Sequence, residues 1–157
     1  MQFETVEWAD PRAAALREAM NVETGAMYAE RMASQTAEEQ AAVDVSLAID
    51  PATIVHTVLV IDDGVPVGHA ALRPWNGELE VKKVFIAPEA RGRGLSRALM
   101  IELERVAGER GIPSLVLQTG NLQLAAIALY ESMGYRPIDV YGLYTAIPDA
   151  LCYRKVL

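Results

Sequence analysis

The chain has 157 residues, of which 52% are hydrophobic and 22% charged, and its formal net charge is −7. This length suits one domain, and the acidic balance argues against binding to nucleic acid through the overall field. No apolar run reaches the about 20 residues that span a bilayer, and the N-terminus lacks the order of a signal peptide. We therefore expect a single cytoplasmic domain over residues 1–157, with no membrane partner.

Metal chemistry is not expected from the composition. Cys152 is the single cysteine, and His56 and His69 are the only histidines. A lone cysteine forms no internal disulfide, and these three residues show no zinc-ligand spacing. We therefore predict no metal site.

The N-terminal third reads as a short strand followed by helices. Residues 3–8 fit a strand, and Asp10-Pro11 supplies an N-cap and a proline at the first helical position. The apolar positions of residues 13–33 follow a helical period, which Gly25 is expected to break into two helices. A capping box formed by Thr36 and Glu39 predicts a further helix to about residue 47.

The central part favours three antiparallel strands. Residues 54–61 and 65–72 are rich in β-branched side chains and flank Asp-Asp-Gly, which predicts a hairpin. Residues 78–87 follow a second turn and stop at Pro88, which cannot donate to a ladder.

The remainder alternates helices and strands. After a loop over residues 89–92, a stripe of leucines and a valine predicts a helix of about eighteen residues, which Gly111 and Pro113 end. A strand over 114–118, a helix over 125–133 and a strand over 151–156 complete the chain. This order indicates an α/β or α+β domain with one mixed sheet.

The segment that joins the third strand to the long helix has the features of a phosphate site. Gly92 and Gly94 let the backbone approach a ligand, and the free N–H groups at the helix start point at it. The surrounding segment is basic, with one acid, Glu89, against Lys82, Lys83, Arg91, Arg93 and Arg97. A glycine-containing turn whose arginines merely contact solvent is the alternative interpretation.

The segment from Arg91 to Ser96 resembles the Arg/Gln-x-x-Gly-x-Gly/Ala signature of the GNAT superfamily of acyl-CoA-dependent N-acyltransferases. It departs from the signature at Ser96, where glycine or alanine is usual. The resemblance implies that acetyl-CoA is the co-substrate and that its diphosphate contacts Arg91, Gly92, Arg93, Gly94, Leu95, Ser96 and Arg97. It also implies that the backbone of Val84, Phe85 and Ile86 polarises the thioester carbonyl or holds the pantetheine amides.

A second GNAT-like motif begins about thirty residues downstream. The run from Gln123 to Pro137 resembles Asn-x-x-Ala-x-x-x-Tyr-x-x-x-Gly-Phe, with Gln123 in the usual asparagine position and Asn121 as a possible substitute. Tyr130 takes the family's frequent general-acid position, where a phenol can protonate the departing thiolate. The alternative is an ordinary core tyrosine, because Tyr130 belongs to an apolar helical stripe.

A base is also needed, because an amine with a reference pKa near about 10 is mostly protonated at neutral pH. Glu80 matches a glutamate that many GNAT members use as a base, often through water. A solvated residue on a strand face is the alternative interpretation of this glutamate.

The resemblance covers residues 78–137 and implies one mixed, mostly antiparallel sheet of about six or seven strands flanked by about four or five helices. The implied activity is acetyl transfer to a primary amine of a small molecule or peptide by direct attack in a ternary complex. Acidic residues over 18–50 suggest a rim that attracts a cationic amine, while polyamines, amino acids, antibiotics and peptide N-termini all stay open as acceptors. A non-catalytic acyl-CoA-binding module is the alternative function, and a homodimer is a further possibility that the family suggests.

Overall fold

The computed structural model describes residues 1–157. Strand β1 (Gln2–Val6) leads to helix α1 (Pro11–Met27), where the Asp10 carboxylate accepts from the backbone N–H of Arg12. Helix α1 runs through Gly25 and ends at Met27, with Tyr28 as its C-cap, so the predicted break at Gly25 is wrong in position. An added side chain at Gly25 would meet nothing within 4 Å, which shows that neither crowding nor a special conformation acts at that glycine.

Two shorter helices follow the break. Helix α2 (Ala29–Ser34) ends at Gln35, and helix α3 (Ala37–Leu47) starts with the predicted capping box. In that box the Glu39 N–H donates to the Thr36 hydroxyl, and the Thr36 N–H donates to the Glu39 carboxylate. The capping box is therefore confirmed.

The central strands are β2 (His56–Asp62), β3 (Val65–Trp75) and β4 (Glu78–Ile86), preceded by the short 3-10 turn Pro51–Thr53. They form an antiparallel meander, as predicted. The β2–β3 turn places Asp63 and Gly64 at positive φ angles of 48° and 78°, which suits a two-residue hairpin.

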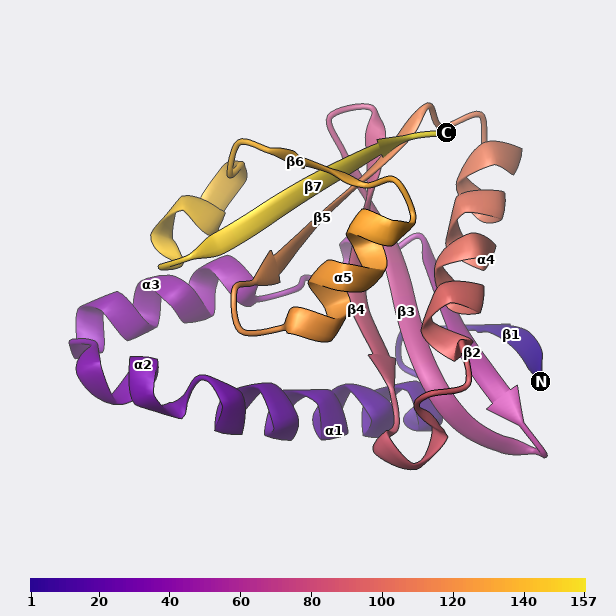
Figure 1. Cartoon of the computed structure of the whole chain (residues 1–157), viewed down its shortest axis with the longest axis horizontal. Helices are drawn as coiled ribbons and strands as arrows, with labels where there is room; N and C mark the ends of the chain where they lie inside the picture. Colours follow the sequence, from indigo (N-terminus) through magenta and orange to yellow (C-terminus); the bar gives the residue numbers. More distant parts are fainter.

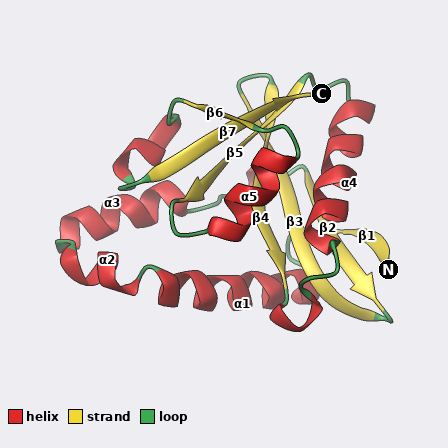
Figure 2. Ribbon diagram, viewed as in Figure 1, coloured by secondary structure: helices red, strands yellow, loops and turns green.

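A 3-10 turn (Pro88–Ala90) joins β4 to helix α4 (Leu95–Glu109), and β5 (Ser114–Gly120), α5 (Leu124–Ser132) and β7 (Ala150–Val156) follow as predicted. Two further elements have no sequence prediction: β6 (Arg136–Ile138) and the 3-10 segment Gly142–Ala146. Figures 1 and 2 show these elements arranged around one sheet. Its strand order is β1-β2-β3-β4-β5-β7-β6, and only β4 and β5 run parallel.

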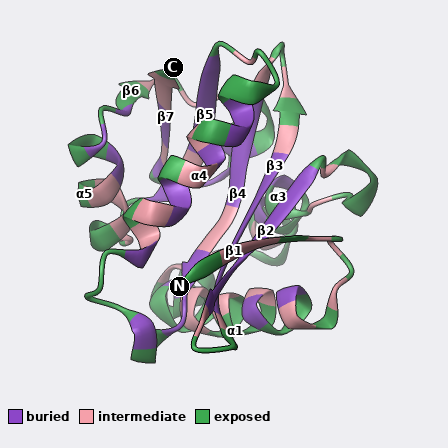
Figure 3. Ribbon diagram, turned by 90° about the vertical axis from the view of Figure 1, so that its right-hand side faces the viewer, coloured by how far each residue is buried: buried purple, intermediate pink, exposed green.

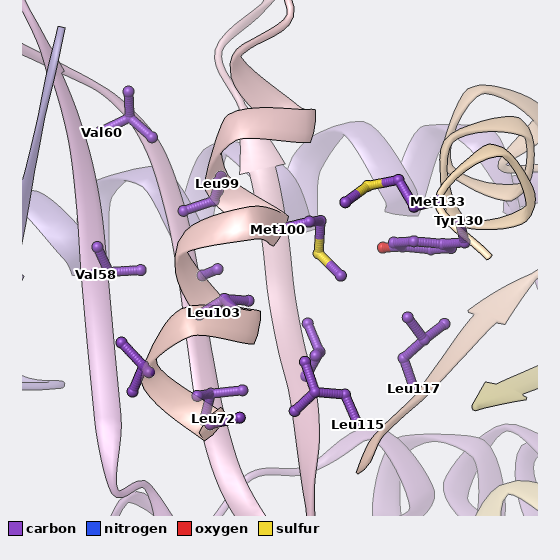
Figure 4. Packing of buried hydrophobic residues seen from close by; sticks show 14 of the residues in the cluster. Val58, Val60, Leu72, Leu99, Met100, Leu103, Leu115, Leu117, Tyr130 and Met133 are labelled. Carbon is purple, nitrogen blue, oxygen red and sulfur yellow. The ribbon is translucent and has the colours of Figure 1, made fainter. Parts of the chain in front are cut away.

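The sheet separates two layers of helices. On β2, Val58 and Val60 face the cluster that contains α4 and α5, while Leu59 and Ile61 face α1. Figure 3 shows the buried residues concentrated along β2 to β5, and Figure 4 shows Leu99 and other α4 side chains packed over these strands. Helix α3 and the segment Gly142–Ala146 cover the far end of the sheet on the α1 face.

Seven strands and five α-helices match the predicted fold class. The apolar stripe on α4 accounts for the largest cluster, since its buried positions follow the helical period. The sheet thereby places β4 and β5 at the centre of the molecule.

Candidate active site

Strands β4 and β5 pair over a short stretch and then separate. Their parallel ladder joins Leu79–Val81 to Leu115–Leu117, and no pair joins the two strands beyond it. Figure 1 shows the strands diverging, with α5 lying across the opening. An unpaired strand edge leaves backbone N–H and C=O groups without a ladder, so this split offers donors and acceptors to an extended ligand.

A bulge in β4 accompanies the split. The β3–β4 register shifts near His69, and Lys83 takes a φ of 55°, in the left-handed region that side chains rarely adopt. The His69 ring braces this strained residue, because its Nδ1 lies 2.8 Å from the Lys83 carbonyl and its Nε2 lies 3.1 Å from the Arg17 guanidinium. Arginine only donates, so Nδ1 carries the proton and the ring is neutral. Burial lowers the pKa of His69 to about 4, in agreement with that state.

A cavity of about 440 Å³ occupies the split and is lined from both faces of the sheet. Ala126 and Tyr130 of α5 line it on one face, and residues of α1, α2 and α3 line it on the other. Residues Val81–Val84 of β4 and Leu117–Gly120 of β5 form its edges. The cavity therefore passes between the two strands and connects the two helical layers.

The loop after β4 presents main-chain donors. Gly92 and Gly94 take φ angles of 76° and 75°, which glycine adopts without strain. The backbone N–H groups from Gly92 to Arg97 donate no hydrogen bond within the chain, and Ala98 is the first to donate, to the Gly94 carbonyl at 3.1 Å. Consecutive free N–H groups at the positive end of a helix dipole form a site for a phosphate-type anion.

The arginines of this loop are tied to the protein itself. Each donates to a partner within the chain: Arg91 to Glu23 at 2.7 Å, Arg93 to Asp62 at 2.6 Å and Arg97 to the Ser132 hydroxyl at 2.6 Å. Carboxylates thus already neutralise two of these three charges. The main-chain N–H groups of the segment, unlike these three side chains, therefore have no partner within the chain.

Tyr130 reaches the cavity with a free hydroxyl. Its side chain packs against Tyr135 and Tyr153, with ring centroids 5.8 and 6.4 Å away, and the residue is 6% exposed. The hydroxyl has no hydrogen-bond partner in the chain, and it is not among the polar atoms sealed from solvent without one. Figure 4 shows the ring extending from α5 with the oxygen at its tip. Burial raises the pKa of Tyr130 well above its usual range, so the phenol keeps its proton at neutral pH.

Glu80 lies behind the cavity wall rather than in it. Its side chain is fully buried at 0% exposure. One carboxylate oxygen accepts from Arg73 Nε at 2.6 Å, and the other accepts from the hydroxyls of Tyr141 at 2.6 Å and Tyr144 at 2.9 Å. Both carboxylate oxygens therefore have partners within the chain, and Glu80 is not among the residues that line the cavity.

Lys82 connects this buried cluster to the cavity. It lines the cavity at 7% exposure, its Nζ donates to the Tyr144 hydroxyl at 2.5 Å, and it lies 3.8 Å from Glu80. Burial lowers the pKa of Lys82 to about 8, although the negative charge of Glu80 acts in the opposite direction. In the sequence, Lys82 counts among the basic residues around the loop. In the structure, the alternation of side chains along β4 places it on the face of the sheet that α3 covers.

This geometry can be set against known proteins. The model of the acetyltransferase (GNAT) family matches residues 13–135 of this chain. The chain belongs to the GNAT family. The match runs from α1 to the end of α5 and so includes the loop, the split and Tyr130.

Several GNAT proteins are similar to this chain. An IAA acetyltransferase of Azospirillum brasilense is 36% identical over 90 residues, which cover 57% of this chain and 59% of the relative. A streptothricin acetyltransferase of Streptomyces lavendulae is 38% identical over 80 residues, covering 50% of this chain and 42% of the relative. The matched regions thus span less than two thirds of these curated relatives.

The fold similarity extends over the whole chain. A Klebsiella pneumoniae protein assigned to the acyl-CoA N-acyltransferases superposes with a TM-score of 0.78 at 28% identity, covering 99% of this chain and 97% of that one. A GNAT acetyltransferase of Elizabethkingia anophelis, with acetyl-CoA bound, gives a TM-score of 0.70 at 16% identity, covering 99% and 97%. At that lower identity the likeness shows the GNAT fold alone.

The remaining GNAT motif positions divide between the cavity and the surface. Gln123 precedes α5 and lines the cavity, and Val84 does so from β4. Asn121 is exposed and does not line it, while Phe85 and Ile86 are buried in the packing on opposite faces of the sheet. Any contact of Phe85 or Ile86 with a ligand is therefore limited to the backbone.

No group of three or more His, Cys, Asp or Glu side chains is arranged to hold a metal ion. None of the helices combines the length and apolarity that crossing a membrane requires.

Proposed function

We propose that this GNAT chain transfers the acetyl group of acetyl-CoA to a primary amine by direct attack in a ternary complex. The observation that carries the proposal is the free hydroxyl of Tyr130 at a cavity that joins both helical layers through the β4–β5 split. The names of the relatives agree with an acyl-transfer activity.

The chain's residues suit the parts of acetyl-CoA. The free N–H groups from Gly92 to Arg97 form the cradle expected for a diphosphate. The unpaired edge of β4 at Val84–Ile86 and the Gln123 amide suit the two pantetheine amides. When bound, acetyl-CoA supplies a thioester whose carbonyl carbon an amine can attack.

Tyr130 completes the transfer by donating a proton. As the amine nitrogen forms its bond to the carbonyl carbon, the carbon–sulfur bond breaks and its electron pair passes to sulfur. The phenol protonates the departing thiolate. The reference pKa of such a thiol is close to that of cysteine, about 8.5. The nitrogen loses one proton as the amide forms, and the phenolate of Tyr130 takes up that proton, so the phenol is restored.

A protonated amine must also lose a proton before it can attack, and Lys82 is the group at the cavity that is placed to accept this first proton and pass it to solvent. Its lowered pKa, about 8, gives it a neutral fraction near physiological pH, which a general base requires. Glu80 as the base stays a prediction, and in this arrangement a proton would reach it through Lys82 and Tyr144. Glu80 otherwise acts by positioning these two side chains.

Steady-state thiol release with acetyl-CoA and a panel of amines tests the proposal. We expect Tyr130→Phe to lower kcat by about a hundredfold or more while CoA binding stays intact. A normal rate in that variant would remove the role of Tyr130. Tight CoA binding by calorimetry with no thiol release for any amine would instead establish the non-catalytic acyl-CoA-binding module.

The pH profile separates the two candidate bases. If neutral Lys82 takes the proton, kcat/KM rises about tenfold per pH unit and levels off near about pH 8, and Lys82→Met abolishes that limb. If the limb persists in Lys82→Met and disappears in Glu80→Gln, the proton passes to Glu80 by another route.

A further inference from the structure

Arg31 is a cavity-lining arginine without a partner in the chain. It comes from α2, its guanidinium carbon lies 4.4 Å from the centre of the Tyr28 ring, and its Nε is buried with no hydrogen bond. It forms no ion pair, whereas the arginines of the cofactor loop each have a partner. Its two terminal nitrogens also make no hydrogen bond within the chain and, unlike Nε, are not closed off from solvent, so they can donate to an anion that a ligand brings into the cavity.

The platform beneath Arg31 is held firmly. Tyr28 is 8% exposed, and its hydroxyl accepts from the backbone N–H of Leu122 at 3.3 Å. Gly120 makes room for that hydroxyl, because a side chain there would come within 1.8 Å of it. The ring beneath the Arg31 guanidinium is therefore held in place before any ligand arrives, which lowers the cost of ordering this side chain around an anion.

The charges that line the cavity are mainly positive. They are Arg31, Lys82 and Lys83, against the single carboxylate of Asp44, which accepts from Gln40 at 2.8 Å. The other acidic residues expected from the sequence to attract a cation do not line the cavity: Glu18, Glu23, Glu30, Glu38, Glu39 and Asp50. In a chain of net charge −7, this site thus has the opposite sign to the surface around it.

We propose that the acceptor is an amino acid with an apolar side chain, whose carboxylate binds Arg31 while its amine faces Lys82. This inference rests on the proposed acetyl transfer and names its acceptor class. Val43, Leu47 and Ile147, which line the same side of the cavity, suit the apolar side chain. A polyamine is disfavoured, because its second ammonium group would lie near Arg31, where the amino acid has its carboxylate.

Matched amines test the proposal. Leucine, leucinamide and isoamylamine share an apolar body and differ in the carboxylate, and each is assayed with wild type, Arg31→Gln and Arg31→Lys. We expect Arg31→Gln to lower kcat/KM for leucine at least about tenfold and to change the value for leucinamide less than about twofold, with partial recovery in Arg31→Lys. Ratios taken for each amine separately remove differences in basicity.

Arg136→Gln is the matched control, since Arg136 is exposed on β6, outside the cavity, and we expect no change for any amine. Equal losses for leucine and leucinamide in Arg31→Gln, or no loss for either, would overturn the proposal. So would O-phosphoethanolamine as the best substrate with a loss in Arg31→Gln, because the anion would then be a phosphate.

A binding measurement separates this inference from the proposed function. If CoA binds but no amine is acetylated, acetyl transfer fails, and calorimetry of leucine with the CoA-saturated protein decides the carboxylate site alone. Leucine binding that Arg31→Gln abolishes supports the site, and absence of leucine binding to wild type overturns it.

Discussion

The two sides of the cavity that we propose for the cofactor and for the acceptor, called the cofactor side and the acceptor side, are built in different ways. The cofactor side is one continuous stretch, from β4 through the glycine loop into α4, and its donors are backbone N–H groups. The acceptor side gathers single side chains from α2, α3, β4 and the segment near Tyr144, and its chemistry depends on their charges. A cofactor that is the same in every family member can be bound by main-chain groups, which every residue has. The choice of acceptor requires side chains, which substitutions can alter.

The largest effect is expected where the acceptor side is most buried. Glu80→Ala leaves Arg73 and Lys82 beside an empty position without their carboxylate, which should lower the free energy of unfolding by about 3–5 kcal/mol. Urea unfolding measures the loss. Glu109→Gln, which removes an exposed ion pair with Arg105 on α4, is the control and should change little. A small loss in Glu80→Ala would show that the cluster is not a structural unit of the acceptor side.

An intermediate effect is expected at the bulge that the two sides share. The pKa of His69 is lowered to about 4 from 6.5, so the neutral ring favours the folded state. This contribution is complete above the unfolded pKa of 6.5 and is lost as the pH falls towards about 4, by an amount on the order of 3 kcal/mol. The difference between the stability–pH curves of wild type and His69→Gln isolates it from other groups. Parallel curves between pH 4 and 6.5 would contradict the prediction.

The smallest effect is expected on the cofactor side alone. Gly94→Ala places a side chain at a φ of 75°, so we expect the loop to shift and the Kd for CoA to rise about tenfold, with the acceptor KM unchanged. Calorimetry with CoA measures the change. Gly108→Ala, in the same helix with open space around it, should leave the Kd unaltered. Similar weakening in both variants would mean that helix α4, rather than the conformation at Gly94, controls binding.

The local structure of the cofactor side agrees with the sequence prediction, because the signals for it are local. Glycines at Gly92 and Gly94, the helix that begins at Leu95 and the spacing to Tyr130 all depend on neighbouring residues. The fold class follows from the same local periodicities, which place nearly every strand and helix.

The acceptor side escapes prediction because its contacts join distant residues. Glu80 is identified as a candidate, but its partners Tyr141 and Tyr144 lie 61 and 64 positions away in a segment without a periodic pattern. The helix break at Tyr28 rather than Gly25 has a similar origin, since Tyr28 packs against Gly120. The sequence contains no signal that singles out Arg31, because what distinguishes this arginine is that its guanidinium has no hydrogen-bond partner in the folded chain.

The separation of β4 from β5 has a consequence for how the reactants meet. The gap between these two strands opens on both faces of the sheet, one opening lying beneath α5 and the other beneath the N-terminal helices. In the proposed reaction, donor and acceptor enter through different openings and are bound at the same time, so the acyl group passes directly between them without a covalent intermediate on the protein.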